Sequence, residues 1–312
     1  MPEQDVRDYV GLDIGKRQLD YALADAATAR VAYTAAGLAQ LIAAVRQQPH
    51  PCVVCEATGG YERRVVAALG AAGIAVCLVS PGRVRAFARA QGLLAKTDPI
   101  DARLLRQFGQ TLHPRVYTPL PRAAAELRAL LEYRGLLVAQ LAELPSRHEV
   151  AGETLRPLLL EHQSRLHEAL AGIETRLRTQ LQTQPELSAK ALRLQQVTGV
   201  GVILAASLLA YVPELGQISD KSLSALVGVA PHPHDSAASS RPRHVRGGRA
   251  AIRRVLYMSA VCAARFNPRL RAFYLRLRAA GKPAMVAVVA VMRKLLCLLN
   301  RLIADPDFVL AS

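Results

Sequence analysis

Hydrophobic positions in the first hundred residues follow the period of strands and then that of helices. Apolar runs predict three strands, over 6–14, 18–25 and 29–35, and a tight turn over 15–17 joins the first two. Helices and strands then alternate along the chain. These are predicted as helix 38–47, strand 51–56, helix 61–72, strand 74–79 and helix 81–92. A three-strand meander followed by this alternation predicts an α/β domain at the N-terminus.

The pattern changes after residue 120. Apolar residues recur at helical spacing from 121 to about 181, which predicts long, paired, coiled-coil-like helices. The segment 192–215 resembles a helix-hairpin-helix, in which Gly199 and Gly201 would let backbone N–H groups approach a phosphate. A simple glycine turn between two core helices is the alternative explanation of the same sequence. We therefore predict three segments, an α/β domain over 1–115, a helical spacer or oligomerisation region over 116–190 and a mainly α domain over 191–312.

The positive charge of the chain is concentrated near its C-terminus. Forty Lys and Arg against 24 Asp and Glu give a net charge of +16. Residues 1–115 carry +4, residues 116–190 are neutral with nine charges of each sign, and residues 191–312 carry +12. Such a surface favours a polyanion, because each neutralised phosphate releases condensed counterions. The simpler alternative is a generally basic surface without a partner.

Four carboxylates occur at positions where the surrounding apolar pattern does not explain a charged side chain. Asp13 and Glu56 each end an apolar strand-like run, and Asp98 and Asp101 share one face of a predicted helix for which Thr97 is the expected N-cap. Carboxylate oxygens hold Mg²⁺ or Mn²⁺, and paired ions stabilise both the attacking and the leaving oxygen at phosphorus. The order of elements matches a ribonuclease H-like, or RuvC-like, layout, in which two strands and a later helix supply the acids. Asp98 alone is also explained as a residue that stabilises the helix dipole.

The cysteines and the apolar segments indicate in which cellular compartment the protein is expected. Five cysteines, an odd number, favour a reduced, cytosolic protein, which we expect to associate with the bacterial nucleoid. Cys52 and Cys55 form a lone Cys-x-x-Cys in a strand, where buried thiols are the default and a zinc site is the weaker hypothesis. The apolar stretches 197–212 and 284–304 are too short or too charged to predict a membrane span.

Residues 228–260 add a serine in basic surroundings, and with them the resemblance becomes specific. Together with the acids, this segment resembles the IS110 family of insertion-sequence transposases, which pair a RuvC-like acidic (DEDD) domain with a C-terminal serine domain. The matching pieces run in order as Asp13, Glu-Ala-Thr-Gly-Gly-Tyr at 56–61, Lys-Thr-Asp-x-x-Asp-Ala at 96–102, Ala-Pro at 230–231, Asp235-Ser236, Gly-Gly-Arg at 247–249 and Leu-Tyr-Met at 256–258. They cover nearly the whole chain.

The resemblance implies a DNA transposase that cuts and rejoins DNA. In it Ser236 attacks a phosphodiester and forms a phosphoserine link, while the four acids hold Mg²⁺ or Mn²⁺. It also implies a guide RNA encoded by the element, and dimers and tetramers. One departure is Ala237, where the family usually has glycine, and neighbouring Ser239 or Ser240 is an alternative nucleophile. A structural serine-rich loop explains the same letters.

Arginines follow the serine closely and are expected to gather phosphates around it, because guanidinium forks bind phosphate oxygens bidentately. These expected nucleic-acid contacts are Arg241, Arg243, Arg246, Arg249, Arg253 and Arg254. The contiguous His232, His234, Asp235 and Ser236 also invite a hydrolase-triad hypothesis. Triad members usually converge from separate segments and no Gly-x-Ser-x-Gly elbow is present, so we do not adopt it.

Three rival functions stay open. Gly-Leu-Asp-Ile-Gly-Lys at 11–16 also resembles the first phosphate loop of sugar kinases and actin-like ATPases, but we find no second phosphate loop or adenosine motif. The acids alone are consistent with a RuvC-like nuclease or junction resolvase that uses water. An inactive, nucleic-acid-binding relic of a transposase is the third possibility.

Overall fold

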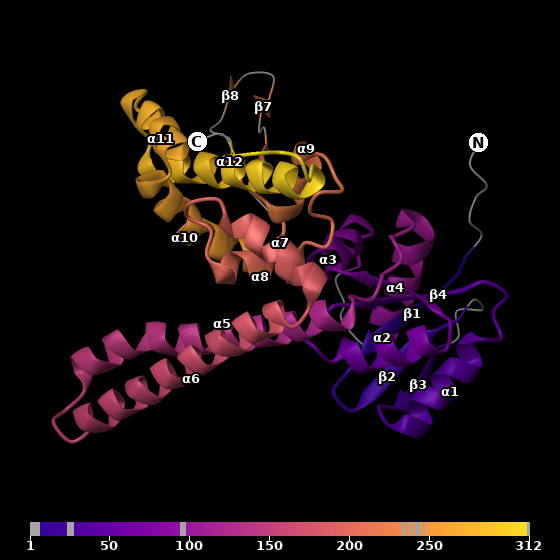
Figure 1. Ribbon diagram of the computed structural model, residues 1–312. Helices are drawn as coiled ribbons and strands as arrows, with labels where there is room; N and C mark the ends of the chain where they lie inside the picture. The colour runs from indigo at the N-terminus through magenta and orange to yellow at the C-terminus, as the bar shows by residue number, and fades with distance from the viewer. Residues whose placement is uncertain are drawn as a thin grey trace. The chain divides into compact units, whose positions relative to one another are not determined.

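The computed structural model describes residues 7–23, 28–93, 98–232, 235–236, 239–240, 244–245 and 247–310. Contacts divide the chain into two compact units, Met1–Pro119 and Leu120–Ser312, and each is described by itself (Figure 1). The first boundary lies close to the predicted one at 115. The described contacts form two units where we predicted three segments.

Unit 1 is a five-stranded mixed sheet with helices on both faces. Its strands are β1 (Asp8–Ile14), β2 (Gln18–Ala22), β3 (Thr28–Ala32), β4 (Pro51–Glu56) and β5 (Ala75–Val79). They lie in the order β3-β2-β1-β4-β5, with β1 antiparallel to β2 and parallel to β4. This order confirms the predicted ribonuclease H-like fold.

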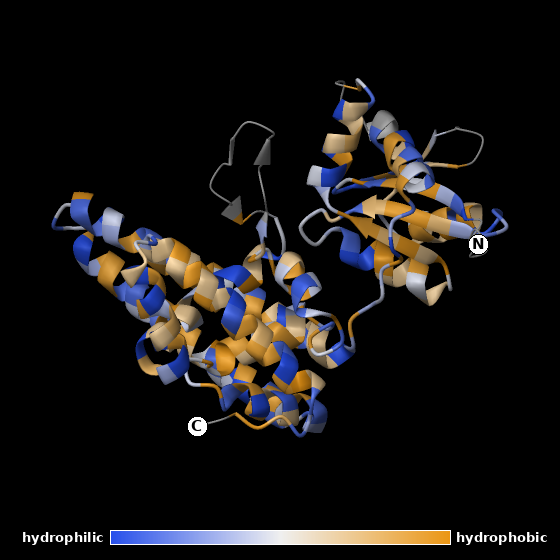
Figure 2. Ribbon diagram, turned by 90° about the horizontal axis from the view of Figure 1, so that it is seen from above, coloured by the Kyte–Doolittle hydropathy of each residue, from blue (hydrophilic) through white to orange (hydrophobic). Residues whose placement is uncertain are grey.

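Two apolar clusters cover the two faces of the sheet. On one face, Val10, Leu12 and Ile14 of β1 pack with α1 (Ala35–Val45) and α2 (Glu62–Ala71). On the other, Tyr9 and Val54 pack with α3 (Pro81–Ala90) and α4 (Asp98–Leu112). Alternate residues of a strand point to opposite faces, so odd-numbered residues of β1 and even-numbered residues of β4 face α4. Figure 2 shows the hydrophobic strands at the centre of this unit.

The same alternation separates the two cysteines of the Cys-x-x-Cys motif. Cys52 belongs to the α4 face and Cys55 to the α1–α2 face, and both are buried. Burial raises the pKa of Cys55 to about 12, which keeps it a neutral thiol. The two sulfurs therefore cannot share a metal, and the prediction of buried strand thiols is confirmed.

Among the residues that the structure describes, unit 2 is helical apart from four two-residue strands. Its helices are α5 (Arg122–Val150), α6 (Arg156–Gln182), α7 (Pro185–Gln195), α8 (Val202–Tyr211), α9 (Asp220–Val227), α10 (Ala250–Phe266), α11 (Pro268–Ala279) and α12 (Ala284–Ala304). At its centre lies α8, which is apolar on all sides and is contacted by α5, α6, α7 and α10 (Figure 2). A core that includes Leu127, Leu208 and Leu299 therefore joins the base of the predicted spacer to the C-terminal helices.

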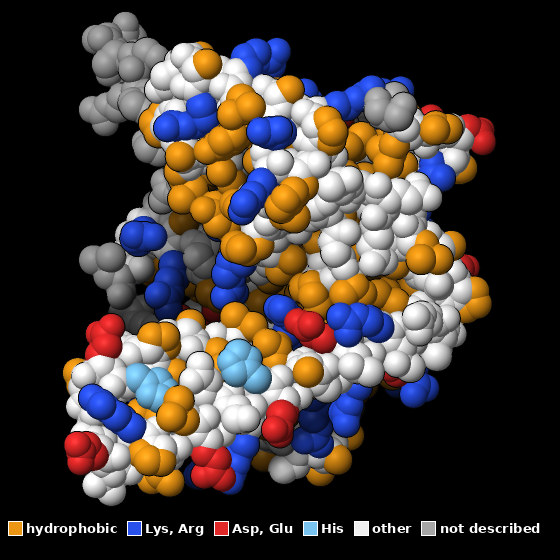
Figure 3. Space-filling view, turned by 60° about the vertical axis from the view of Figure 1, so that its left-hand side comes forward, with side chains coloured by type: hydrophobic (Ala, Val, Ile, Leu, Met, Phe, Trp, Pro, Cys, Tyr) orange, Lys and Arg blue, Asp and Glu red, His pale blue; other side chains and the backbone are white. Residues whose placement is uncertain are grey.

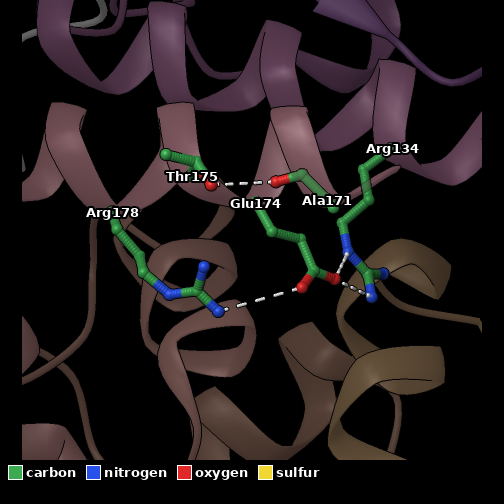
Figure 4. A network of polar contacts seen from close by, with 5 residues as sticks. All are labelled: Arg134, Ala171, Glu174, Thr175 and Arg178. Atoms are coloured by element: carbon green, nitrogen blue, oxygen red, sulfur yellow. Dashed lines mark hydrogen bonds and ion pairs between the residues drawn. The ribbon is translucent and has the colours of Figure 1, made fainter. Parts of the chain in front are cut away.

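The α5–α6 pair forms the long helical hairpin that the sequence predicts. Leu131 and Leu137 of α5 and Leu177 of α6 are buried along it. Between the helices, the Arg134 guanidinium donates to Glu174 at 2.8 and 3.0 Å, as Figure 4 shows. None of the described helices is long and apolar enough to cross a membrane.

Candidate catalytic site

Two of the predicted acids lie side by side at one end of the sheet. Leu12 pairs with Cys55 across the parallel strands β1 and β4, so the next residues, Asp13 and Glu56, are level with each other. By the alternation described above, both side chains belong to the α4 face. The strands end here, so the two carboxylates mark one edge of the core on that face.

Helix α4 crosses β1 almost in backbone contact. A Cβ on Gly11 would lie 1.9 Å from the Ala102 carbonyl oxygen and 2.5 Å from the Arg106 nitrogen, so only glycine permits this approach. The Arg106 side chain also donates to the Tyr9 carbonyl at 3.2 Å. Because Gly11 and Asp13 share a face, the start of α4, which carries Asp101 next to Ala102, lies on the same face as Asp13.

The donor chemistry of this corner fits a hard divalent cation. Asp13, Glu56 and Asp101 offer only carboxylate oxygens, the ligands that Mg²⁺ and Mn²⁺ prefer. Asp98 begins α4, but its side chain lies outside the described residues. Among the described residues, no three His, Cys, Asp or Glu are grouped closely enough to hold a metal ion. The four-acid site therefore stays a prediction, and its assembly depends on the first turn of α4.

A fifth carboxylate, Asp20, was missed by sequence reasoning. Asp20 pairs with Asp13 across β1 and β2 and is only 4% exposed. Its carboxylate forms an ion pair with Arg30 of β3 at 2.8 Å. One row across the sheet thus reads Arg30, Asp20, Asp13, Glu56. Two signals for Asp20 were available in the sequence. It is an acid between apolar residues in Gln-Leu-Asp-Tyr-Ala, and a hairpin that turns at residues 15–17 brings it opposite Asp13.

A rigid loop follows Glu56. The Glu62 carboxylate accepts hydrogen bonds from the Gly60 N–H at 2.8 Å, the Thr58 N–H at 3.0 Å and the Thr58 hydroxyl at 3.1 Å. Burial alone would raise the pKa of Glu62, but these hydrogen bonds outweigh it and hold that pKa below its usual value. Gly59 and Gly60 both have positive φ, so this turn needs glycine at both positions. The Glu-Ala-Thr-Gly-Gly-Tyr motif thus has a structural explanation.

The predicted nucleophile lies on a narrow ribbon in unit 2. Strand β6 (Pro231–His232) pairs with β9 (His244–Val245), and β7 (Asp235–Ser236) pairs with β8 (Ser239–Ser240). Ser236 is paired with Ser239 across β7 and β8, whose labels are seen in Figure 1. The Ser236 side chain lies outside the description, and its catalytic role stays a prediction.

The base of this ribbon is fixed by glycines and one arginine. A Cβ on Gly228 would lie 2.2 Å from the Gly247 carbonyl oxygen, and one on Gly248 would lie 2.3 Å from the Gly228 nitrogen. The Arg249 fork binds both oxygens of Glu214 at 2.7 and 2.8 Å and donates to the Tyr211 carbonyl at 2.6 Å. The Gly-Gly-Arg motif therefore holds the two ends of the ribbon together. Arg249 has this structural duty, so we do not carry it forward as a nucleic-acid contact.

The other predicted contacts differ in what the structure says of them. Arg241, Arg243 and Arg246 lie outside the described residues, Arg253 donates to the Gly247 carbonyl, and Arg254 is exposed. Those contacts stay predictions.

Gly199 and Gly201 lie in the turn between α7 and α8, as the predicted hairpin requires. A Cβ on Gly199 would meet Ala263 at 2.7 Å, which explains that glycine by helix packing, whereas the space around Gly201 is open. We therefore keep only Gly201 as a candidate phosphate contact, and its role stays a prediction.

A ribonuclease H-like sheet with carboxylates at adjacent strand ends, joined to a strongly basic helical unit, is typical of metal-dependent enzymes that act on nucleic acid. Two family models match this chain. One, a transposase model of the IS110 type with a DEDD domain, matches residues 10–149, and the other, transposases of the IS116/IS110/IS902 family, matches residues 191–275. The chain belongs to the IS110 family of transposases, which are DNA recombination enzymes.

Curated relatives agree with this assignment. The pilin gene-inverting proteins of Moraxella lacunata and Moraxella bovis are each 27% identical over 249 residues, which cover 78% of this chain and 77% of the relative. An uncharacterized 43.6 kDa protein of insertion element IS110 from Streptomyces coelicolor is 29% identical over 154 residues, covering 49% of this chain and 37% of that protein. A DEDD domain implies a divalent metal, and the transposase family implies DNA binding.

Proposed function

We propose that this protein is the recombinase of a mobile element, and that it cuts and rejoins DNA through a covalent link to Ser236. The observation that carries the proposal is the union of two features in one chain. The proposal is supported by the register of β1 and β4, which makes Asp13 and Glu56 neighbours at their strand ends, and by the pairing of Ser236 with Ser239 near the segment anchored by Arg249. The relatives named for pilin gene inversion support a rearrangement of DNA.

The chemistry of the proposed link balances in two steps. In the first, the Ser236 hydroxyl gives up its proton, its oxygen bonds to phosphorus, and the bond from phosphorus to the 3′ oxygen breaks. That oxygen takes up a proton and leaves as a 3′ hydroxyl. In the second, the 3′ hydroxyl of a new partner strand attacks the same phosphorus and the serine oxygen departs. Since each step exchanges one phosphoester for another, no ATP is needed.

The acids serve this reaction by their position. Asp13, Glu56, Asp98 and Asp101 are proposed to hold Mg²⁺, with Mn²⁺ as a substitute. The bound cation would neutralise charge on the attacking and leaving oxygens and lower the pKa of the serine hydroxyl. The Glu62 loop and the close contact at Gly11 keep Glu56 and the start of α4 in place.

The decisive experiment looks for a protein–DNA adduct. Purified protein is incubated with Mg²⁺, co-expressed element RNA and end-labelled donor and target DNA, and then denatured and separated by electrophoresis. We expect a labelled protein band whose tryptic peptide carries phosphoserine at 236. The Ser236→Ala variant should form no band, whereas the matched Ser239→Ala variant should form it normally.

Other outcomes separate the alternatives. Cleavage without an adduct, unaffected by Ser236→Ala, would favour a RuvC-like nuclease that uses water. An adduct that survives in Ser236→Ala and is lost in Ser239→Ala would move the nucleophile. DNA binding without cleavage under all these conditions would favour an inactive relic.

Guide RNA and self-association form the last part of the proposal. We expect a structured RNA to be needed for recombination, and omission of RNA from the adduct assay tests this. For self-association, the neutral α5–α6 hairpin suits another protein better than a polyanion. A hollow of about 640 Å³ between these helices is lined by Leu130, Ile173 and the half-exposed Tyr133 together with polar side chains such as Arg176 and Gln180.

The proposed occupant of this hollow is the hairpin of a second copy of the chain. In sedimentation velocity, we expect Tyr133→Glu to shift the protein toward monomer. The equally surface-lying Leu93→Glu of unit 1 should leave the oligomer unchanged. If both variants sediment as the unaltered protein does, the hairpin is not the interface.

A further inference from the structure

Helix α11 stands out for its one-sided charge. It carries Arg269, Arg271, Arg276 and Arg278 and no acid, and all four arginines are exposed. The chain around it is equally unbalanced, because residues 236–304 contain 15 Lys and Arg and no Asp or Glu. In Figure 3, blue side chains lie among orange ones over the upper left and centre of the face, whereas red, blue and pale-blue side chains mix over the lower part. A basic helix without acidic partners suits a polyanion.

The arginines of α11 form two rows on opposite flanks. At 100° per residue, Arg269 and Arg276 share one flank, and Arg271 and Arg278 share the other. Within each row the residues are seven apart, about 10.5 Å along the axis. Between the rows the exposed surface is small or apolar, and it is made by Ala272, Leu275 and Ala279. The remaining face, which includes the buried Leu270, packs on the unit.

Two anchors make α11 a stiff element. The Asn267 side chain caps its first turn by accepting from the Leu270 N–H at 3.2 Å. Phe273 packs on the core, and the Arg276 guanidinium and the Lys294 ammonium lie 5.4 and 4.5 Å from its ring centroid. A helix fixed in this way presents its outer face with little conformational entropy left to lose on binding.

We propose that α11 lies in the major groove of duplex DNA, with one arginine row on each phosphate backbone and Ala272, Leu275 and Ala279 toward the base edges. The B-form major groove is about 12 Å wide and admits an α-helix, whose diameter with side chains is about 10–12 Å. Small residues in the middle let the helix sink until both rows reach phosphates. The major groove of an RNA duplex is too deep and narrow for this, so DNA is the expected partner. The inference rests on the proposed DNA recombinase function, which assigns no role to α11.

The test compares two variants that each lose four positive charges. In the first, the four α11 arginines are changed to Gln, and in the second, the exposed arginines of the α5–α6 hairpin are changed, as Arg122→Gln, Arg147→Gln, Arg165→Gln and Arg178→Gln. Affinity for a 30-base-pair DNA duplex is measured from 50 to 200 mM NaCl. Four lost phosphate contacts should lower the slope of log affinity against log salt by about 3 to 4 and weaken binding about 100-fold or more at 100 mM. The hairpin variant should change affinity less than about 3-fold.

Groove occupancy is read separately by dimethyl sulfate protection of guanine N7, which faces the major groove. The unaltered protein should protect guanines in the duplex, and Ala272→Glu, which adds a carboxylate to the exposed middle of α11, should abolish that protection. Circular dichroism should show that all variants stay folded with nearly the same helix content, since every altered side chain is exposed.

The other possible results contradict either this inference or the proposed function. If the unaltered protein binds DNA but the α11 variant binds equally well, this inference is wrong and the proposed function stands. The inference also fails if duplex RNA is bound as strongly as DNA through the same arginines, or if the α11 changes alter only the sedimentation coefficient. If the unaltered protein binds no DNA at all, the proposed function fails first.

Discussion

The contact between Gly11 and α4 gives the sharpest prediction about the candidate site. Gly11→Ala would place a methyl group 1.9 Å from the Ala102 carbonyl oxygen. An ordinary contact is about 3.4 Å, so α4 would have to retreat by about 1.5 Å at its acidic end. Both clashing groups are backbone, and no side-chain rotamer can relieve them. We expect unit 1 to lose about 3 kcal/mol or more, at the upper end of overpacking costs.

The same retreat should also weaken metal binding. Metal–oxygen distances tolerate about 0.2 Å, far less than the predicted shift of Asp101 from Asp13 and Glu56. Mn²⁺ affinity, measured by calorimetry, should therefore fall about 10- to 100-fold, as when ligand support is lost. Hydrogen exchange of α4 and β1 peptides gives the matching loss of local stability, which a global melt of two units would blur.

Two other glycines supply matched controls. Gly109→Ala lies farther along α4 and meets the Tyr9 ring at 2.6 Å and a Val54 methyl at 2.8 Å, so it should cost about 1–3 kcal/mol. It should leave Mn²⁺ affinity within about 3-fold, because the acids lie at the other end of the helix. Gly70→Ala in α2 meets nothing within 4 Å and should stabilise by about 0.5–1 kcal/mol. If Gly11→Ala binds Mn²⁺ like the unaltered protein, α4 does not bring its acids to β1, and the four-acid site is refuted.

Three further predictions concern other parts of the structure, and urea titration monitored by hydrogen exchange of local peptides measures each. Arg30→Ala should lower the stability of unit 1 by about 3 kcal/mol, because it leaves the buried Asp20 carboxylate without its cation. Asp20→Asn should lower it by only about 1 kcal/mol, because Arg30 is half exposed to water. If Asp20→Asn cost more than Arg30→Ala, the ion-pair role would be contradicted. The pKa of Glu62 lies below its usual value of 4.5, so the stability that its carboxylate contributes is present above pH 4.5 and is lost as pH falls through the lower folded-state pKa. The difference in stability between the unaltered protein and Glu62→Gln should therefore shrink from pH 6 to pH 3. A difference that stays constant over this range would exclude the linkage. Gly199→Ala should cost at least about 2 kcal/mol because Ala263 and a φ of +100° oppose a side chain, whereas Gly201→Ala should cost about 0.5–1 kcal/mol; equal costs would argue against the packing explanation.

Local patterns in the sequence were sufficient for most of the fold. Strand β4 runs over 51–56 as predicted, and the first helices differ from prediction by one to three residues at their ends. Apolar period and turn glycines are local signals, so they locate elements without knowledge of the partners. The two long helices were predicted for the same reason.

Residues whose reason lies far away in the chain could not be understood in this way. Gly11 reads as a weak strand residue until α4, some ninety positions later, passes over it. Arg249 reads as a phosphate fork, yet its fork is filled by Glu214, 35 positions earlier. Gly199 reads as a phosphate contact, yet it makes room for Ala263. In each case the residue type can be read in the sequence, but its partner depends on tertiary packing that no local pattern contains.

The distribution of charge separates two tasks that the proposed reaction must combine. A row of carboxylates at the ends of β1 and β4 repels DNA locally, and residues 1–115 carry a net charge of only +4 against +12 for residues 191–312. Ser236 opens the stretch of 69 residues that contains no acid, and α11 lies within that same stretch. In the proposed reaction, the reacting phosphate would therefore be held mainly by unit 2, and the acids would act on a substrate already bound. It follows that added salt should weaken substrate binding steeply and leave the rate of adduct formation at saturating DNA nearly unchanged.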